Sequence, residues 1–256
     1  MPDHLFDITG RLALVTGSSR GLGYAMALGL AGRGACVILH GRDDARVTAA
    51  AQEMSTATGA DIAHVSFDVA DAQATRTALA QLIDRHGVPD ILVNNAGLQR
   101  RGAIHKIAPD DWDAVIATNL SSVFHVSREL VSGMIARGSG KIVNTGSAHS
   151  ALARATSAPY SASKAGVAML TRGMAADLAR HGIQVNCLSP GFFQTDITAA
   201  LWQDPDFDSW LRERTPSARW GQPDDLVGTL IYLCSDASNF VCGQNLFVDG
   251  GLTSVV

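Results

Sequence analysis

The chain has 256 residues, with 20 lysines and arginines against 24 aspartates and glutamates, which gives a formal net charge of −4. Because a phosphate backbone is bound by a broad basic surface, this mildly acidic balance argues against nucleic acid as a partner. Hydrophobic residues make up 46% and charged residues 17%, a composition typical of globular proteins.

No segment is predicted to cross a membrane. The longest uncharged stretch, 182–195, is too short and too polar to span a bilayer. The N-terminal MPDHLFDITG has acids and no apolar core, which argues against a secretory signal. The four cysteines form no CxxC pattern, so we expect buried, reduced thiols. The sequence therefore predicts a cytoplasmic protein with no metal site.

Short apolar runs alternate with longer amphipathic stretches along the chain. The expected strands are 12–16, 35–39, 62–67, 91–93, 141–144, 183–188 and 246–248. The expected helices between them are 25–31, 43–58, 71–85, 112–137, 158–179 and 223–233. Nearly continuous apolar strands separated by helices are typical of a parallel sheet covered on both faces. The pattern predicts an α/β fold: one doubly wound Rossmann-type domain over 1–256, with a seven-stranded parallel sheet.

A long segment between the sixth strand and the last helix breaks this rhythm. Residues 192–216 contain Phe192, Phe193, Trp202, Phe207 and Trp210. Long excursions in compact domains are often lids or binding loops, and a helical cap packed on the domain body is a compatible alternative. We expect this segment to form a lid on the substrate side.

A glycine-rich turn, TGSSRGLG over 16–23, follows the first strand and opens the first helix. Gly17 and Gly21 permit a tight turn and close backbone approach, and Gly23 lets the helix pack near the sheet. The helix N-terminus then presents free N–H groups and a positive dipole end to a pyrophosphate. Glycines at a strand end can serve only to turn the chain, but the strand–turn–helix context favours a dinucleotide site.

The TGxxxGxG spacing resembles that of the short-chain dehydrogenase/reductase family. Matching motifs follow along the whole chain: Asn94-Asn-Ala-Gly97, Asn119, Ser147, Tyr160-Ser-Ala-Ser-Lys164 and Pro190-Gly191. The resemblance implies a dehydrogenase or reductase that acts on CH–OH groups with a nicotinamide cofactor. It implies cofactor contacts at Gly17, Ser19, Arg20, Gly21, Leu22, Gly23, Gly41, Arg42, Asp68, Val69, Asn95, Ala96, Gly97, Tyr160, Lys164, Pro190, Gly191, Phe193 and Thr195.

The end of the second strand indicates which nicotinamide cofactor is bound. Sites for NAD usually carry an acid there, bonded to the ribose 2′-hydroxyl. Here Gly41 occupies that position and Arg42 follows it, while Arg20 lies in the glycine turn. Two guanidinium groups suit a 2′-phosphate, so we predict NADP(H) in preference to NAD(H). Arg42 could also be a solvated helix start, and Asp68 either the family's adenine-contacting acid or a helix cap.

The resemblance implies Ser147, Tyr160, Lys164 and Asn119 as catalytic residues. A tyrosine with a pKa of about 10 is a poor base near neutrality, and a nearby cation lowers that pKa. Tyr160 and Lys164 are four residues apart, so a helix places them on one face. In the family's pattern Ser147 bonds the substrate oxygen and Asn119 orders a water beside the lysine. Ser150 is a rival to Ser147.

Arginines near the NNAG turn narrow the resemblance. Arg100 and Arg101 follow that turn, and Arg154 lies between Ser147 and Tyr160. The pattern is most like the sugar-acid branch of the family, the gluconate 5-dehydrogenases. A sugar acid needs a cation for its carboxylate and polar partners for its hydroxyls. The predicted substrate contacts are Arg100, Arg101, His149, Arg154 and Trp202, although each arginine could equally be ordinary surface charge.

The predicted reaction interconverts a hydroxyl and a ketone on a sugar acid, D-gluconate and 5-dehydro-D-gluconate before others. Another keto-polyol, a deoxyketogluconate or a 3-oxoacyl-type ketone stays open as the substrate. A non-catalytic nucleotide-binding regulator is a further alternative, since a fold does not fix a function. The resemblance also implies a homotetramer, with the long helices after the fourth and fifth strands at one two-fold interface and the last helix and strand at another.

Overall fold

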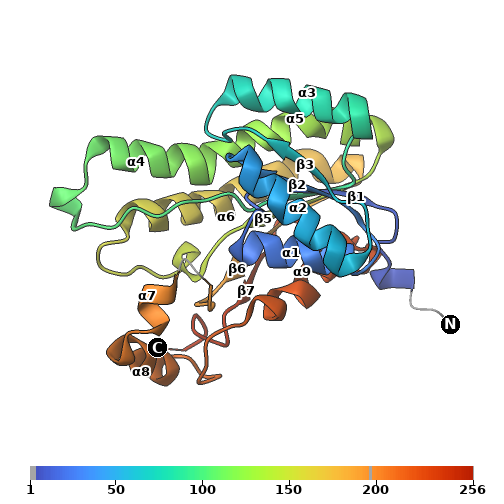
Figure 1. The fold of residues 1–256 in the computed structure, drawn as a ribbon. Helices are drawn as coiled ribbons and strands as arrows, with labels where there is room; N and C mark the ends of the chain where they lie inside the picture. The colour runs from blue at the N-terminus through green and yellow to red at the C-terminus, as the bar shows by residue number, and fades with distance from the viewer. Residues whose placement is uncertain (1–3, 196–197, 256) are drawn as a thin grey trace.

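The computed structural model describes residues 4–195 and 198–255. Its strands form one parallel sheet in the order β3-β2-β1-β4-β5-β6-β7 (Figure 1). They are β1 Leu12–Val15, β2 Cys36–Gly41, β3 Ala63–Ser66, β4 Ile91–Asn94, β5 Gly140–Thr145, β6 Ile183–Pro190 and β7 Asn245–Val248. The predicted seven-stranded, doubly wound parallel sheet is confirmed.

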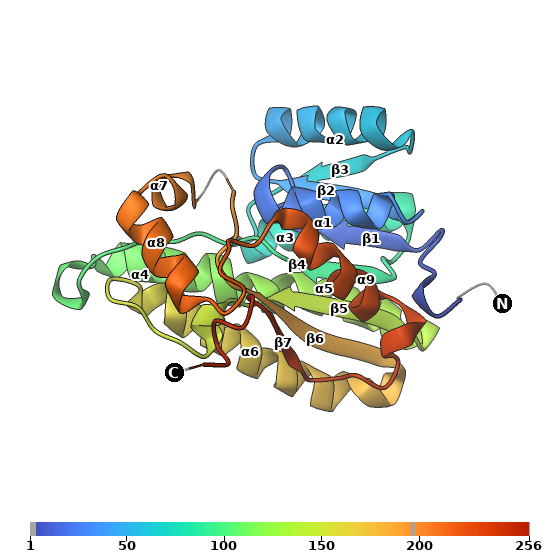
Figure 2. The same ribbon diagram turned by 90° about the horizontal axis from the view of Figure 1, so that it is seen from below.

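Helices cover both faces of the sheet (Figures 1 and 2). One face carries α1 (Gly21–Ala31), α2 (Asp44–Thr58) and α9 (Val227–Cys234), and the other α3 (Ala72–His86), α5 (Ser122–Arg137) and α6 (Ala158–Leu178). Successive strand residues alternate between these layers: Ala13 and Val15 join the first hydrophobic cluster and Leu14 the second. Within the described residues, no helix is long and apolar enough to cross a membrane.

The region expected as one helix over 112–137 has three parts. Helix α4 (Pro109–Ile116) and α5 are joined by a π-helical turn over Ala117–Ser121. Asn119 in that turn bonds to the backbone of Leu98, whose N–H lies 2.8 Å from Oδ1 and whose carbonyl lies 2.9 Å from Nδ2. Single π turns of this kind are frequent at functional sites. The last helix also differs from prediction, because it begins with a 3-10 turn over Pro223–Leu226.

The segment predicted as a lid is largely a helical cap. It contains α7 (Ala199–Trp202) and α8 (Pro205–Arg214), while positions 196–197 lie outside the described residues. The side chains of Phe207, Leu211 and Trp220 form a buried cluster, with Phe192 and Trp202 packed against it. Both helices lie at the same end of the molecule as α4 (Figure 2). The cap is thus fixed to the body by aromatic packing.

All four cysteines are free thiols. Cys187 and Cys234 are buried and Cys242 is half-buried, but Cys36 is exposed, so the expectation that these thiols are buried is wrong there. Cys36 is the first residue of β2, where the strand enters the sheet from solvent.

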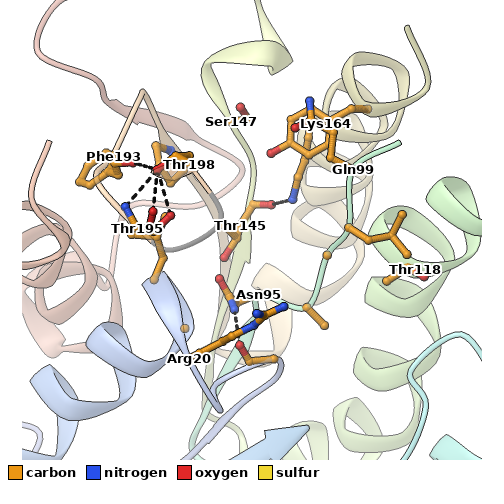
Figure 3. A pocket seen from close by; sticks show the side chains of 18 of the residues that line it. Arg20, Asn95, Gln99, Thr118, Thr145, Ser147, Lys164, Phe193, Thr195 and Thr198 are labelled. Atoms are coloured by element: carbon orange, nitrogen blue, oxygen red, sulfur yellow. Dashed lines mark hydrogen bonds between the residues drawn. The ribbon is translucent and has the colours of Figure 1, made fainter. Parts of the chain in front are cut away.

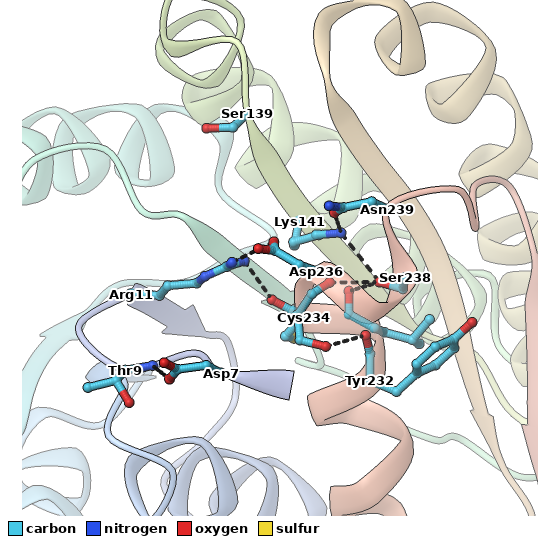
Figure 4. A network of polar contacts seen from close by, with 12 residues as sticks. Asp7, Thr9, Arg11, Ser139, Lys141, Tyr232, Cys234, Asp236, Ser238 and Asn239 are labelled. Atoms are coloured by element: carbon cyan, nitrogen blue, oxygen red, sulfur yellow. Dashed lines mark hydrogen bonds and ion pairs between the residues drawn. The ribbon is translucent and has the colours of Figure 1, made fainter. Parts of the chain in front are cut away.

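A network of polar contacts lies at the amino ends of β1 and β5 (Figure 4). Arg11, before β1, pairs with Asp236 at 2.6 Å and donates to the Cys234 carbonyl at 3.1 Å. The ammonium of Lys141, in β5, donates to Asn239 Oδ1 at 2.7 Å and to Ser238 Oγ at 3.3 Å. The network joins two central strands to the turn after α9. Burial lowers the pKa of Lys141 to about 8.

We expect Lys141→Met to be more stable than the native protein at pH 7. Removing a charge from a desolvated site should raise the free energy of unfolding by about 1–3 kcal/mol. Between pH 8 and 10.5 the unfolded chain holds more protons than the folded one, so the native protein should gain stability as the pH rises, and the variant should lack that gain.

Urea unfolding at pH 7 and 9.5 measures both effects. Asn239 is exposed and stays solvated when the lysine is lost, whereas Ser238 Oγ keeps its bonds to Leu233 and Ser235. A variant that is less stable at both pH values would contradict the argument.

Candidate functional site

A cavity of about 410 Å³ lies at the carboxyl ends of the strands. It extends from the glycine turn past β2 and β4 to Thr145 at the end of β5, and on to Tyr160 and Lys164 on α6 (Figure 3). Strand order reverses between β1 and β4, because the chain runs outward from β1 to β3 and then returns. This is the place where doubly wound sheets bind their ligands.

The ends of β1 and β4 are tied together at the floor of the cavity. The Thr16 hydroxyl accepts hydrogen bonds from the N–H groups of Asn95 and Ala96 at 2.9 and 3.0 Å. The Asn95 amide donates in return to the carbonyls of Thr16 and Gly17, both at 3.0 Å (Figure 3). The NNAG motif therefore shapes the glycine turn as well as lining the cavity.

The glycine turn has the geometry that a dinucleotide needs. Gly17 and Gly21 have φ values of +63° and +60°, a region that favours glycine. A Cβ on Gly23 would lie 2.3 Å from the Gly17 carbonyl and 2.4 Å from Asn95 Nδ2, so α1 can approach only without a side chain there. An ideal Cβ on Gly21 would meet nothing within 4 Å outside its own turn of helix, so the positive φ, and not crowding, favours glycine there. These residues fit a bound pyrophosphate.

Cations surround the end of the cavity beside β2. Arg20, Arg42 and Arg46 all line it. Arg42 also lies 3.8 Å from Asp68 Oδ2, with both side chains substantially exposed. Gly41 occupies the position where an acid would face a ribose hydroxyl, and its ideal Cβ would lie 3.4 Å from Ser19 Oγ. The charge at this end of the cavity suits a phosphate.

Ser147, Tyr160 and Lys164 all line the same cavity. Lys164 is buried, and its ammonium donates to the Thr145 carbonyl at 2.6 Å, a bond that Figure 3 shows, while Nζ lies 5.8 Å from the Tyr160 ring centroid. The Ser147 hydroxyl accepts from the His149 N–H at 3.1 Å. Ser150 donates its hydroxyl to the Lys164 carbonyl at 3.1 Å, which makes it a support for α6.

Burial governs the titration of this pair. It raises the pKa of Tyr160, while the Ser147 hydroxyl and the Arg101 guanidinium oppose that rise. It also lowers the pKa of Lys164 to about 8. Desolvation of the phenolate therefore outweighs the two groups that lower the tyrosine pKa.

Asn119 is buried behind the cavity. Besides its two bonds to Leu98, its Nδ2 lies 3.1 Å from Ser163 Oγ on α6. Both N–H groups of this amide thus donate to protein oxygens, and its oxygen accepts one bond. These bonds tie the segment after the NNAG turn to α6.

The structure separates the three arginines that were predicted to contact substrate. Arg100 pairs with Asp111 on α4 at 3.3 Å. Arg101 lines the cavity, and Arg154 stacks on Phe207 of α8 with Cζ 4.5 Å from the ring centroid. Burial and then the charges of Arg101 and Arg154 lower the pKa of His149.

One backbone bond holds the loops of Arg101 and Arg154 together. The Gly102 N–H donates to the Thr156 carbonyl at 3.1 Å. Thr156 has a φ of +68°, a left-handed conformation that is strained for a β-branched residue. Such strain persists where the surrounding structure fixes the backbone, and it often accompanies a functional site.

Most predicted site residues line the cavity: Gly17, Ser19, Arg20, Leu22, Gly23, Gly41, Arg42, Val69, Asn95, Ala96, Gly97, Arg101, Ser147, His149, Tyr160, Lys164, Pro190, Gly191, Phe193 and Thr195. Of the predicted residues that the structure describes, those outside the lining are Gly21, Asp68, Arg100, Asn119, Arg154 and Trp202. Trp202 instead joins the aromatic cluster of the cap and donates to the Thr195 carbonyl at 3.4 Å.

Several lining residues were not predicted from the sequence. They include His40, Arg46, Gln99, Thr118, Thr145 and Phe192. Arg46 lies in the first turn of α2, close in sequence to Arg42 before the helix, and that proximity could have indicated it. The positions of Gln99 and Thr118 depend on the bonds of Asn119 to Leu98, which no local pattern indicates.

A glycine turn at the switch point of a doubly wound sheet, with serine, tyrosine and lysine in the same cavity, defines the class of nicotinamide-dependent dehydrogenases and reductases. A family model described as Enoyl-(Acyl carrier protein) reductase matches residues 17–253. The chain belongs to the short-chain dehydrogenase/reductase family.

Relatives cover nearly the whole chain. Gluconate 5-dehydrogenase of Gluconobacter oxydans is 48% identical over 252 residues, with 98% of each chain covered. The 5-keto-D-gluconate 5-reductase of Escherichia coli K12 is 42% identical, with 98% and 99% covered. The crystal structure of a gluconate 5-dehydrogenase from Burkholderia cenocepacia, in complex with NADP and tartrate, is 49% identical with a TM-score of 0.96 and 99% of each chain covered.

Proposed function

We propose that this protein is an NADP-dependent oxidoreductase that interconverts D-gluconate and 5-dehydro-D-gluconate. The observation that carries the proposal is that two groups of residues line one cavity. Three arginines line the end beside β2, and the Ser147, Tyr160 and Lys164 side chains line the other end. Relatives at 42–48% identity are named for this sugar-acid chemistry, and a 49% identical structure holds NADP with tartrate, a hydroxy acid.

In this proposal each residue of the site has a separate role in the reaction. Bound NADP(H) supplies or accepts the hydride. Tyr160 gives a proton to the ketone oxygen or takes it from the alcohol, and Ser147 holds that oxygen beside the phenol. Lys164, fixed by the Thr145 carbonyl, adds positive charge near the phenol. Asn119 positions the segment from Leu98 to Arg101.

We further propose that Arg101 binds the carboxylate of the substrate, with Arg154 behind it and His149 as a partner for a hydroxyl. Arg101 lines the cavity on a segment that is bonded to the Arg154 loop. Arg100 is engaged by Asp111 and Trp202 by the cap, so neither contributes. Residues 192–216 serve as the cover of the substrate side within one domain over 1–256.

Replacing Tyr160 with Phe should keep cofactor affinity and reduce kcat by about 10²–10⁴, because the variant lacks the transferable proton. The measurement is NADPH oxidation with 5-ketogluconate, together with NADPH binding by fluorescence. Turnover near the native rate would remove Tyr160 from the proposal. Cofactor binding by the native protein without turnover of any ketone in a sugar-acid and polyol panel would instead favour a nucleotide-binding regulator.

Replacing Arg42 with Ala should weaken NADP binding about tenfold or more, through loss of charge-assisted bonds to the 2′-phosphate, and leave NAD nearly unchanged. Gly41→Asp should shift preference toward NAD, since it restores an acid at the ribose position. Arg33→Ala removes an exposed cation outside the cavity and serves as the control for net charge. A higher kcat/KM with NAD than with NADP in the native enzyme would overturn the cofactor assignment.

Binding of the substrate carboxylate by Arg101 predicts a preference for negatively charged substrates. Native enzyme should have a much higher kcat/KM for 5-ketogluconate than for fructose, an uncharged ketohexose. Arg101→Ala should abolish most of that advantage, about 10–100-fold, as expected for a lost charge-assisted bond. Arg100→Ala, which removes a cation already paired with Asp111, is the matched control. Equal values for the two sugars in the native enzyme would reject a sugar acid as substrate.

We also propose a homotetramer working in the cytoplasm, without nucleic-acid or membrane partners. Large apolar side chains are exposed on both surfaces that would associate: Phe124 on α5 and Met169 on α6, and Phe240 before β7. Light scattering at micromolar concentration should give a tetramer, and Phe124→Glu should yield a smaller assembly. A native monomer would contradict the proposal.

A further inference from the structure

His40 makes an unusual set of bonds beneath the β2 end of the cavity. It is the penultimate residue of β2 and only 1% exposed. Its Nδ1 lies 3.0 Å from the Gly17 nitrogen, and its Nε2 lies 3.0 Å from the Phe67 carbonyl oxygen. Its backbone is bonded to Ser18 as well, through the Ser18 N–H and the Ser18 hydroxyl, each at 2.9 Å.

These partners fix the tautomer of the ring. The Gly17 N–H can only donate, so Nδ1 must be unprotonated, and Nε2 therefore carries the proton that it donates to Phe67. A protonated imidazole would direct a second donor at the Gly17 N–H. Burial lowers the pKa of His40 to about 4, against the opposing effects of the Phe67 carbonyl and the Asp68 carboxylate, so the neutral form holds at neutral pH.

The two ring bonds connect the two walls of that part of the cavity. Gly17 lies in the glycine turn in a left-handed conformation, and Phe67 directly follows β3 and precedes Asp68 and Val69, of which Val69 lines the cavity. The Phe67 ring packs on the imidazole with centroids 4.2 Å apart. An apolar side chain could fill the same volume, but it would leave the Gly17 N–H without its acceptor.

We propose that His40 is a positioning residue for the adenosine half of the cofactor: its neutral imidazole sets the spacing between the glycine turn and the end of β3. The inference rests on the proposed binding of NADP(H). Cofactor affinity should depend more on the hydrogen bond of Nδ1 than on that of Nε2, because only Nδ1 bonds to the phosphate-binding turn.

Three substitutions test this proposal. His40→Asn keeps an acceptor near the position of Nδ1, His40→Gln keeps a donor near that of Nε2, and His40→Leu keeps neither. Dissociation constants for NADP and for adenosine 2′,5′-bisphosphate, a probe of the adenosine half alone, should stay within about threefold for Asn and rise about tenfold or more for Gln and Leu. Their kcat at saturating cofactor should change less than twofold.

His64→Leu provides the matched control. His64 lies on the neighbouring strand β3, and its ring is also hydrogen-bonded, to Thr48 at 3.0 Å, but it is exposed and outside the cavity lining among the described residues. Its affinities should equal those of the native protein. If the Leu variant does not fold, the Asn and Gln pair decides alone.

Two results would overturn the inference. The first is that His40→Gln binds both ligands as tightly as His40→Asn does. The second is that kcat falls together with affinity in every variant, as a general loss of structure would cause. Failure of the proposed NADP(H) binding is a different result, since the native protein itself would then not bind NADP, and failure of the proposed sugar-acid activity would appear as absent turnover with native affinity for NADP.

Discussion

The site depends on the junction between the ends of β1 and β4. These strands are neighbours although the chain runs through β2 and β3 between them. At their carboxyl ends the Thr16 hydroxyl and the Asn95 amide satisfy four backbone groups of the opposite segment. An irregular backbone can be buried only if its polar groups find partners. The junction supplies these partners, and the glycine turn can therefore stay close to the sheet.

The sequence predicts the sheet well because its central strands, such as β1, β4 and β5, are buried on both faces. These strands are short and largely apolar, and the helices between strands have amphipathic faces, so element order and type follow from local pattern. The helix boundaries at 109–122 depend instead on a tertiary contact. The π turn there contains Asn119, whose amide bonds to Leu98 far along the chain. A contact of that range cannot be derived from hydrophobic periodicity.

The candidate site divides in the same way. Residues in compact motifs, such as Tyr160 with Lys164, reach the cavity because a single turn or helix places them. The isolated arginines have no such local constraint. Arg100 pairs with Asp111 on α4, whereas Arg101, the next residue, lines the cavity. Trp202 was expected at the substrate, but it is half-buried against the cluster of Phe207, Leu211 and Trp220 in the cap. The sequence identifies these side chains and leaves their orientation open.

Burial has opposite effects on the two titrating groups of the proposed catalytic pair. It raises the pKa of the Tyr160 phenol and lowers that of the Lys164 ammonium to about 8, because the charged form of each loses solvation. Near neutral pH the protein thus holds a neutral phenol beside a protonated amine. A neutral phenol is already the proton donor that ketone reduction requires. Alcohol oxidation requires the phenolate, whose formation depends on additional positive charge close to the ring. Lys164 and Arg101 are the protein cations placed to supply it.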